Sequence, residues 1–170
     1  MESRVKILGH PAHQMLIVFP LGLLITSVVF DWVARAAESR TFAEVAYWML
    51  LSGIVGGLLA APFGLIDWLA IPRGTRAHAV GLWHGLGNVV VLALFAASLY
   101  LRYTGDRGNP PTAALVLSVA GVLLGAVTAW LGGELVDRLG VGVDPGAHVN
   151  APNSLSGRPA ADGRAMPEAT

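Results

Sequence analysis

The sequence predicts an all-α integral membrane protein whose four helices form an up-and-down bundle. Three observations lead to this fold class. Only 13% of the 170 residues are charged, whereas a soluble domain usually carries roughly 25%. Four long stretches are almost free of charge, and each exceeds the ~20 residues that a helix needs to cross a hydrocarbon core of ~30 Å. Short polar segments separate these stretches, so consecutive helices must be antiparallel.

Each stretch is expected to be a helix, because lipid offers no partner for an unpaired backbone amide. The expected spans are residues 12–36, 43–71, 77–101 and 112–136. Pro20 in the first and Pro62 in the second should kink their helices. In the third, Gly81 and Gly85 have the GxxxG spacing that lets helix backbones approach closely in lipid. The fourth follows Pro111, which suits the first turn of a helix.

An even number of spans places both termini on one side of the membrane, which we name side A; the opposite side is side B. Residues 1–142 form the expected transmembrane domain. Residues 143–170 are polar and rich in Gly, Pro and Ala, so we expect this tail to be disordered. Lys and Arg near the spans are slightly more numerous on side A, and the positive-inside rule therefore places both termini in the cytoplasm.

The composition also excludes several classes of function. The chain has no cysteine, which rules out disulfides, thiolate metal sites and iron–sulfur clusters ligated by this chain. Its net charge is zero and it has no basic run, so we expect no nucleic-acid partner. The expected surroundings are a lipid bilayer.

Histidines provide the strongest hint of a function. All five fall on side A: His10, His13, His78, His84 and His148. His84 lies seven residues beyond Ala77, about 10 Å along a helix. Asp67 and Glu134 lie in the same half of the membrane. Ionisable groups at such depth are costly and mark a functional site facing the bundle interior.

A weak internal repeat relates the two halves of the chain. The segment "LIDWLAIPRGTRAH" (65–78) resembles "LVDRLGVGVDPGAH" (135–148). Asp67 precedes His78 by the same eleven residues that separate Asp137 from His148. We interpret the chain as two related helical hairpins, in which His13 and His84 occupy equivalent positions. On side B, Asp31 and Arg35 are spaced i,i+4, and we expect a helix-end ion pair between them.

Several motifs resemble the bacterial membrane protein family called domain of unknown function 2231 (DUF2231). These motifs are "GHPAHQMLIVFPLGLLITSVVFDW", "GLIDW", "GGELVDRLGVGVD" and the series Arg76, His78, His84 and Asn88. The resemblance covers about residues 8–145. It implies a four-span protein of the bacterial inner membrane and no established activity. Relatives that occur with cytochrome c and Rieske modules hint at a redox role, with a membrane or periplasmic partner. Many relatives carry a further histidine where this chain has Val18.

The histidines allow four interpretations. The first is haem b ligation by His13 and His84, because a haem in a four-helix bundle needs imidazoles from different helices and small residues beside the ring. Asn88, one turn from His84, would orient an imidazole or a propionate, and His78 is a further candidate at the boundary. An electron-transfer role follows from this interpretation.

A second interpretation is a non-haem zinc, iron or manganese site. Its candidate ligands are His10, His13, His84, Asp67 and Glu134. The third is a proton relay or transport, and the fourth is a polar cluster that only stabilises the bundle. The sequence does not choose among them. It also leaves catalytic residues unknown and a homodimer as a candidate assembly.

Overall fold

The computed structural model describes residues 1–163, and within them the chain is mainly helical. Two short strands, β1 (Lys6–Ile7) and β2 (His10–Pro11), pair antiparallel ahead of the helices. The helices are α1 (Ala12–Leu16), α2 (Val18–Ala36), α3 (Arg40–Ala70), α4 (Arg76–Thr104) and α5 (Thr112–Gly133). A π-helical turn, η1 (Glu134–Arg138), continues α5, and a 3-10 turn, η2 (Ser154–Ser156), lies in the tail.

Four helical segments are long and apolar enough to cross a membrane, as the sequence predicts. They are Ala12–Ala36, Arg40–Ala70, Arg76–Thr104 and Thr112–Arg138. The first combines α1 and α2, which are interrupted only at Ile17. Pro20 explains this interruption, because it has no amide proton to donate to the carbonyl of Leu16, where α1 ends. The helix α3 ends just before Pro72, which disfavours helical geometry at Ile71.

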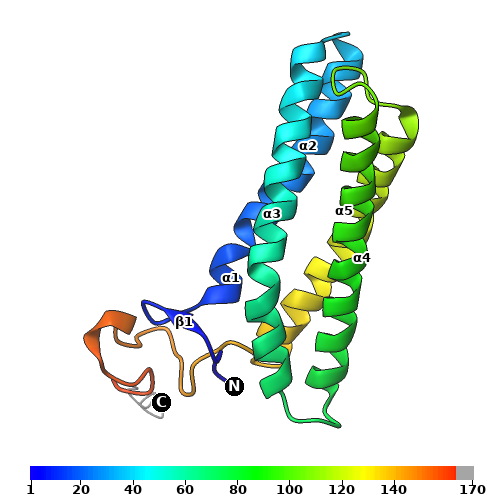
Figure 1. Cartoon of the computed structure of the whole chain (residues 1–170). Helices are drawn as coiled ribbons and strands as arrows, with labels where there is room; N and C mark the ends of the chain where they lie inside the picture. Colours follow the sequence, from blue (N-terminus) through cyan, green and yellow to red (C-terminus); the bar gives the residue numbers. More distant parts are fainter. Residues whose placement is uncertain (164–170) are drawn as a thin grey trace, which may run out of the picture.

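The helices pack as two hairpins that stand side by side (Figure 1). The helix α2 packs along α3, and α4 packs along α5, with fewer contacts between the two hairpins. The amino terminus lies at the same end of the bundle as the connection between α3 and α4 (Figure 1). This is side A, and the opposite end carries the α2–α3 and α4–α5 connections. The observed fold is therefore the predicted helical bundle.

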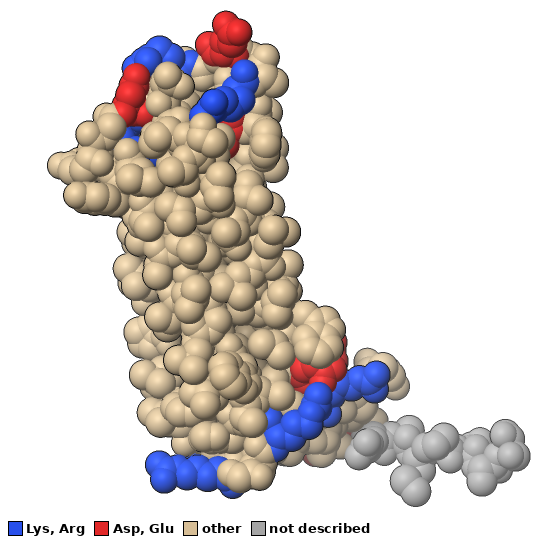
Figure 2. All heavy atoms as spheres, turned by 90° about the vertical axis from the view of Figure 1, so that its right-hand side faces the viewer, with Lys and Arg blue, Asp and Glu red and all other residues tan. Residues whose placement is uncertain are grey.

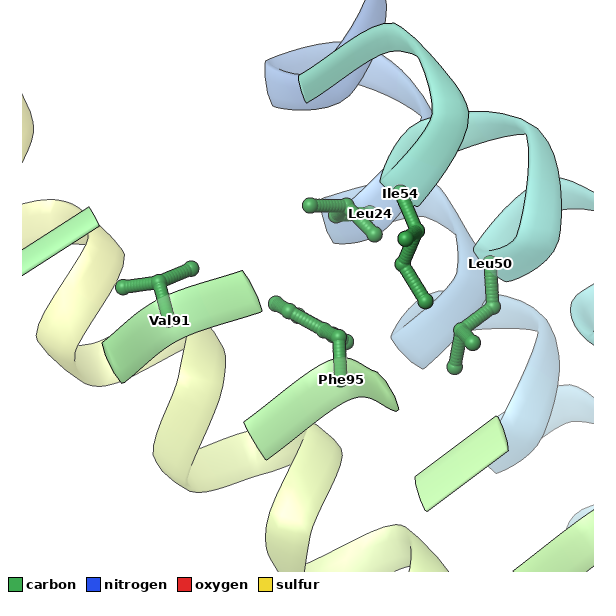
Figure 3. Close-up of a cluster of buried hydrophobic side chains, with 5 residues drawn as sticks. All are labelled: Leu24, Leu50, Ile54, Val91 and Phe95. Atoms are coloured by element: carbon green, nitrogen blue, oxygen red, sulfur yellow. The ribbon is translucent and has the colours of Figure 1, made fainter. Parts of the chain in front are cut away.

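Apolar side chains fill the middle of the bundle. One cluster joins α2, α3 and α4 (Figure 3). It consists of Leu24, Leu50, Ile54, Val91 and Phe95, which are at most 8% exposed. The helix α5 approaches this cluster through Gly121, where an added Cβ would lie 2.7 Å from the Phe95 ring. The small residue is what lets α5 come this close.

Charged residues gather at the two ends of the molecule, with a broad uncharged band between them (Figure 2). Large apolar side chains such as Leu58, Leu123 and Val127 are more than half exposed within this band. Such a surface suits contact with lipid acyl chains. The distribution fits a multi-pass membrane protein.

The first part of the tail lies beside the amino-terminal segment. The amino-terminal ammonium donates a 2.6 Å hydrogen bond to the carbonyl of Gly140. Lys6 forms an ion pair with Asp144, and the Ser154 hydroxyl donates to the carbonyl of Leu8 at 3.4 Å. These contacts give residues 143–163 a defined path beside the amino-terminal strands. Residues 164–170, which the expectation of disorder also covers, lie outside the described part of the chain.

Candidate functional site

His13 lies at the start of the first span, where α1 meets α3. Its Nδ1 lies 3.1 Å from the carbonyl oxygen of Ala60. A carbonyl can only accept, so this contact requires the proton on Nδ1 and, in a neutral ring, leaves the lone pair on Nε2. Gly64, one turn further along α3, makes room for the ring, because a Cβ there would lie 2.8 Å from His13 Cε1.

His84 makes the equivalent contact within the second hairpin. Its Nδ1 donates to the carbonyl oxygen of Thr128 in α5 at 2.8 Å. Gly132, one turn further along α5, leaves space for this ring, since an added Cβ would lie 3.2 Å from His84 Cε1. In both hairpins, a histidine on the first helix binds a carbonyl on the second, four residues before a glycine. This shared arrangement supports the interpretation of the chain as two related hairpins.

Asn88 ties the His84 ring to α5. Its side-chain nitrogen lies 3.2 Å from His84 Nε2 and donates to the His84 carbonyl at 2.9 Å. Its side-chain oxygen accepts a 3.1 Å hydrogen bond from the Thr128 hydroxyl. Asn88 therefore contacts both the His84 imidazole and α5; that it orients a ligand stays a prediction.

The two imidazoles meet between the hairpins. Their ring centres are 6.4 Å apart, and the ring planes are nearly perpendicular, at 86°. Both side chains are half-buried. The structure thus brings together the two histidines that the sequence singles out, in the side A half of the bundle. That they bind a cofactor stays a prediction.

The two candidate carboxylates are engaged elsewhere. Asp67 accepts hydrogen bonds from the Ser3 hydroxyl, at 2.8 and 2.9 Å, and from the Arg4 amide at 2.7 Å. Glu134 accepts from the Arg76 guanidinium at 2.6 Å. Asp67 thereby anchors the amino-terminal segment, and Glu134 ties η1 to the start of α4. Within residues 1–163, no group of three His, Cys, Asp or Glu side chains is placed to hold a metal ion.

The other three histidines remain apart from this pair. His78 stacks against the Trp68 ring, with 4.8 Å between ring centres, and its carbonyl accepts from the Trp68 indole at 3.0 Å. His10 contacts the Ser154 hydroxyl at 3.4 Å, and His148 donates to the carbonyl of Asp162 at 3.2 Å. Their contacts connect turns and termini on side A. Of the five histidines that the sequence places on side A, two therefore lie close together in the bundle, and the other three lie at the end of the bundle on side A.

A second buried polar group, which was not expected from the sequence, lies near side B. Arg102 in α4 makes two 2.7 Å hydrogen bonds with the two carboxylate oxygens of Asp31 in α2. Both side chains are at most 2% exposed. Ser98 and Ser118 lie beside the guanidinium, and the Ser98 hydroxyl donates to the Ala114 carbonyl at 2.7 Å.

The expected ion pair between Asp31 and Arg35 is therefore wrong. Arg35 donates instead to the carbonyl of Pro110 at 3.1 Å. The reason is the length of α4, which continues to Thr104 and so buries Arg102 inside the bundle. The i,i+4 spacing of Ser98 and Arg102 is the one sequence signal that could have indicated this polar face.

The comparisons with known proteins agree with a membrane protein. The family model described as "Predicted membrane protein (DUF2231)" matches residues 9–145. The chain is also similar to phosphatidylglycerol–prolipoprotein diacylglyceryl transferase 2 of Streptomyces coelicolor, with 31% identity over 100 residues. This match covers 58% of the chain but only 32% of the relative, so the chain spans about a third of that protein's length. No solved structure matches the chain.

Proposed function

The chain belongs to the DUF2231 family of predicted membrane proteins, and from this premise we propose that it binds haem b between His13 and His84 and transfers electrons. The observation that carries the proposal is the facing pair of imidazoles inside a membrane helical bundle. Four-helix bundles commonly hold cofactors through side chains on facing helices. Haem supplies one-electron redox chemistry when bound.

The hydrogen bonds of both rings favour a role as ligands. Each Nδ1 donates to a backbone carbonyl, of Ala60 or of Thr128. Metal-ligating histidines are usually held in this way, since the second ring nitrogen fixes the tautomer and leaves the other to bind the metal. The residues of α3 and α5 therefore orient the two imidazoles before any ligand arrives.

The distance between the rings is also suitable. Imidazoles on two different helices would have to lie close together to hold one haem. The observed separation of His13 and His84 is 6.4 Å. The small residues Gly64 and Gly132 line the same region. On binding, Asn88 would release Nε2 of His84 and keep its hydrogen bonds to the His84 carbonyl and the Thr128 hydroxyl.

Haem fits this ligand set better than a free metal ion does. A haem iron needs only two ligands from the protein, whereas a zinc, iron or manganese ion bound by the chain alone requires more. Asp67 and Glu134, the expected further ligands, already bind Ser3 and Arg76. Binding of a non-haem metal ion is therefore the alternative, and the experiment must distinguish it from haem binding.

The test is the absorption spectrum of detergent-purified protein expressed with ample haem, with metal analysis of the same sample. We expect a Soret band in the wild type and its loss in His13→Ala and in His84→Ala. His78→Ala is the matched control, because this half-buried histidine on α4 stacks on Trp68 and should leave the band intact. Stoichiometric metal without a Soret band, lost in the same two variants, would favour the metal ion. A colourless, metal-free wild type would reject both.

A further inference from the structure

A polar cleft of about 420 Å³ opens at side B between the α2–α3 turn and the α4–α5 connection. Figure 2 shows charged side chains of both signs gathered at this end of the molecule. The residues that line it and matter here are Asp31, Arg35, Glu38, Arg40 and Asn109. The buried residues Ala34 and Ala43 form an apolar part of its wall. These positions are the ends of membrane spans, so the cleft lies at the depth of lipid headgroups.

Two of the four charges in the cleft are already neutralised by neighbours. Asp31 is paired with the buried guanidinium of Arg102. Arg40 makes two 2.8 Å hydrogen bonds with the carboxylate of Asp106, and these bonds lower the pKa of Asp106 below its ordinary value. Neither pair has a charge left to attract a ligand strongly.

One cation and one anion remain. Arg35 has a backbone carbonyl, that of Pro110, as its hydrogen-bond partner, and this leaves most of its N–H donors for another group. The carboxylate of Glu38 has neither an ion pair nor a hydrogen bond with the described residues 1–163, and the side chain is exposed at the cleft. The cleft therefore offers one positive and one negative binding group at the membrane boundary.

The backbone at Glu38 gives a separate reason to assign this side chain a role. Its φ is +47°, in the left-handed region where glycine is the usual residue after a helix end. A glutamate there carries backbone strain, and strain of this kind clusters at functional sites. A glycine would connect α2 to α3 with less strain, so the connection itself does not require the carboxylate.

We propose that this cleft binds the headgroup of a zwitterionic phospholipid with a primary ammonium, with the phosphodiester on Arg35 and the ammonium on Glu38. Arginine suits phosphate oxygens because its planar guanidinium can donate two parallel hydrogen bonds. Exposed aromatic side chains on α2 and α3 are available to contact the lipid tails. Trp32 on α2 is 61% exposed, and Phe42 on α3 is 37% exposed. This proposal is independent of the histidine pair, which lies in the other half of the bundle.

The experiment compares two lipids that share the phosphate and differ in the ammonium. The full-length protein is reconstituted in nanodiscs with equal amounts of phosphatidylethanolamine and phosphatidylcholine of the same acyl chains. Retained lipids are then counted by native mass spectrometry. We expect retained phosphatidylethanolamine to exceed phosphatidylcholine by about tenfold, because the trimethylated ammonium cannot donate a hydrogen bond to the Glu38 carboxylate.

Variants assign the effect to the cleft. Glu38→Gln and Glu38→Gly should bring the ratio of the two lipids close to one, and Glu38→Gly should not lower stability, because it relieves the left-handed backbone. Arg35→Gln should reduce both lipids together. Glu44→Gln is the matched control, since Glu44 is exposed on the same side but does not line the cleft; it should leave the ratio unchanged.

Three results would overturn the proposal. Equal retention of the two lipids by the wild type would remove the ammonium selectivity. The same loss in Glu44→Gln as in Glu38→Gln would indicate general surface charge in place of a site. Tighter binding of soluble glycerophosphoethanolamine than of phosphatidylethanolamine would assign the cleft to a free phosphoester.

Discussion

Asp31 and Arg102 show how much a single pair of side chains can matter inside this bundle. Their charges are almost completely removed from solvent, at 2% and 0% exposure. Such a pair adds little net stability, because desolvation of both ions offsets their attraction, but loss of one partner leaves a buried charge alone. The serines beside the guanidinium satisfy part of its remaining hydrogen-bonding capacity.

We therefore predict that Arg102→Met lowers the free energy of unfolding by about 3–5 kcal/mol. The double variant Asp31→Leu with Arg102→Met should recover most of this loss, since no buried charge remains. Unfolding in mixed detergent micelles measures both. The exposed pair of Arg40 and Asp106 provides the control, because Arg40→Gln should have a much smaller effect. A small loss of unfolding free energy in Arg102→Met, which Asp31→Leu does not restore, would contradict this prediction.

At the scale of the helices, charge-free stretches were sufficient to predict the four spans, because a membrane permits so few alternatives. Arg102 was not predicted as the partner of Asp31, because the end of the third span was expected too early. The third span was expected to end at residue 101, whereas α4 continues to Thr104. Arg102 is thus part of α4, where its side chain is fully buried in the bundle. Composition alone does not tell a buried arginine from one at the membrane surface.

The arrangement of the histidines could be predicted in part. The repeat and the depth of His84 indicated that His13 and His84 are the central pair, and the structure places them 6.4 Å apart. The sequence could not reveal that Asp67 is bound by Ser3 and Arg4, because those contacts depend on how the amino-terminal segment folds back. The contribution of Gly64 and Gly132 also depends on the packing of one helix against another, which spacing along the chain does not specify.

Those glycines allow a prediction at the helix scale. Gly64→Ala should displace the His13 ring, because the new Cβ would lie 2.8 Å from it. We expect a loss of stability of about 1–3 kcal/mol, the usual cost of overpacking. Gly125→Ala in α5 is the control, since nothing lies within 4 Å of an added Cβ there, and it should be neutral or stabilising by about 0.4–1 kcal/mol. Thermal unfolding measures the stability of both variants. An equal change in stability for Gly64→Ala and Gly125→Ala would mean that the His13 ring does not need the space beside Gly64.

At the scale of the whole molecule, both hairpins return the chain to side A, where the amino terminus contacts Gly140 (Figure 1). We predict that cysteines introduced at Glu2 and Ser156 react with an impermeant maleimide from the same side of the membrane. A cysteine at Ala37, in the connection between α2 and α3, should react only from the other side. The native chain has no cysteine to interfere. Labelling of Glu2→Cys and Ser156→Cys from opposite sides would reject the bundle topology.

The apolar cluster at the centre of the bundle has an electrical consequence. One face of α4 carries, from side A to side B, His84, Asn88, Val91, Phe95, Ser98 and Arg102. Polar groups occupy both ends of this face, and Val91 and Phe95 interrupt them with side chains that neither donate nor accept hydrogen bonds. Within residues 1–163, a proton or ion that followed this face would find no hydrogen-bond partner on the side chains of Val91 and Phe95. This layer would therefore separate a cofactor held by His84 from proton donors on side B.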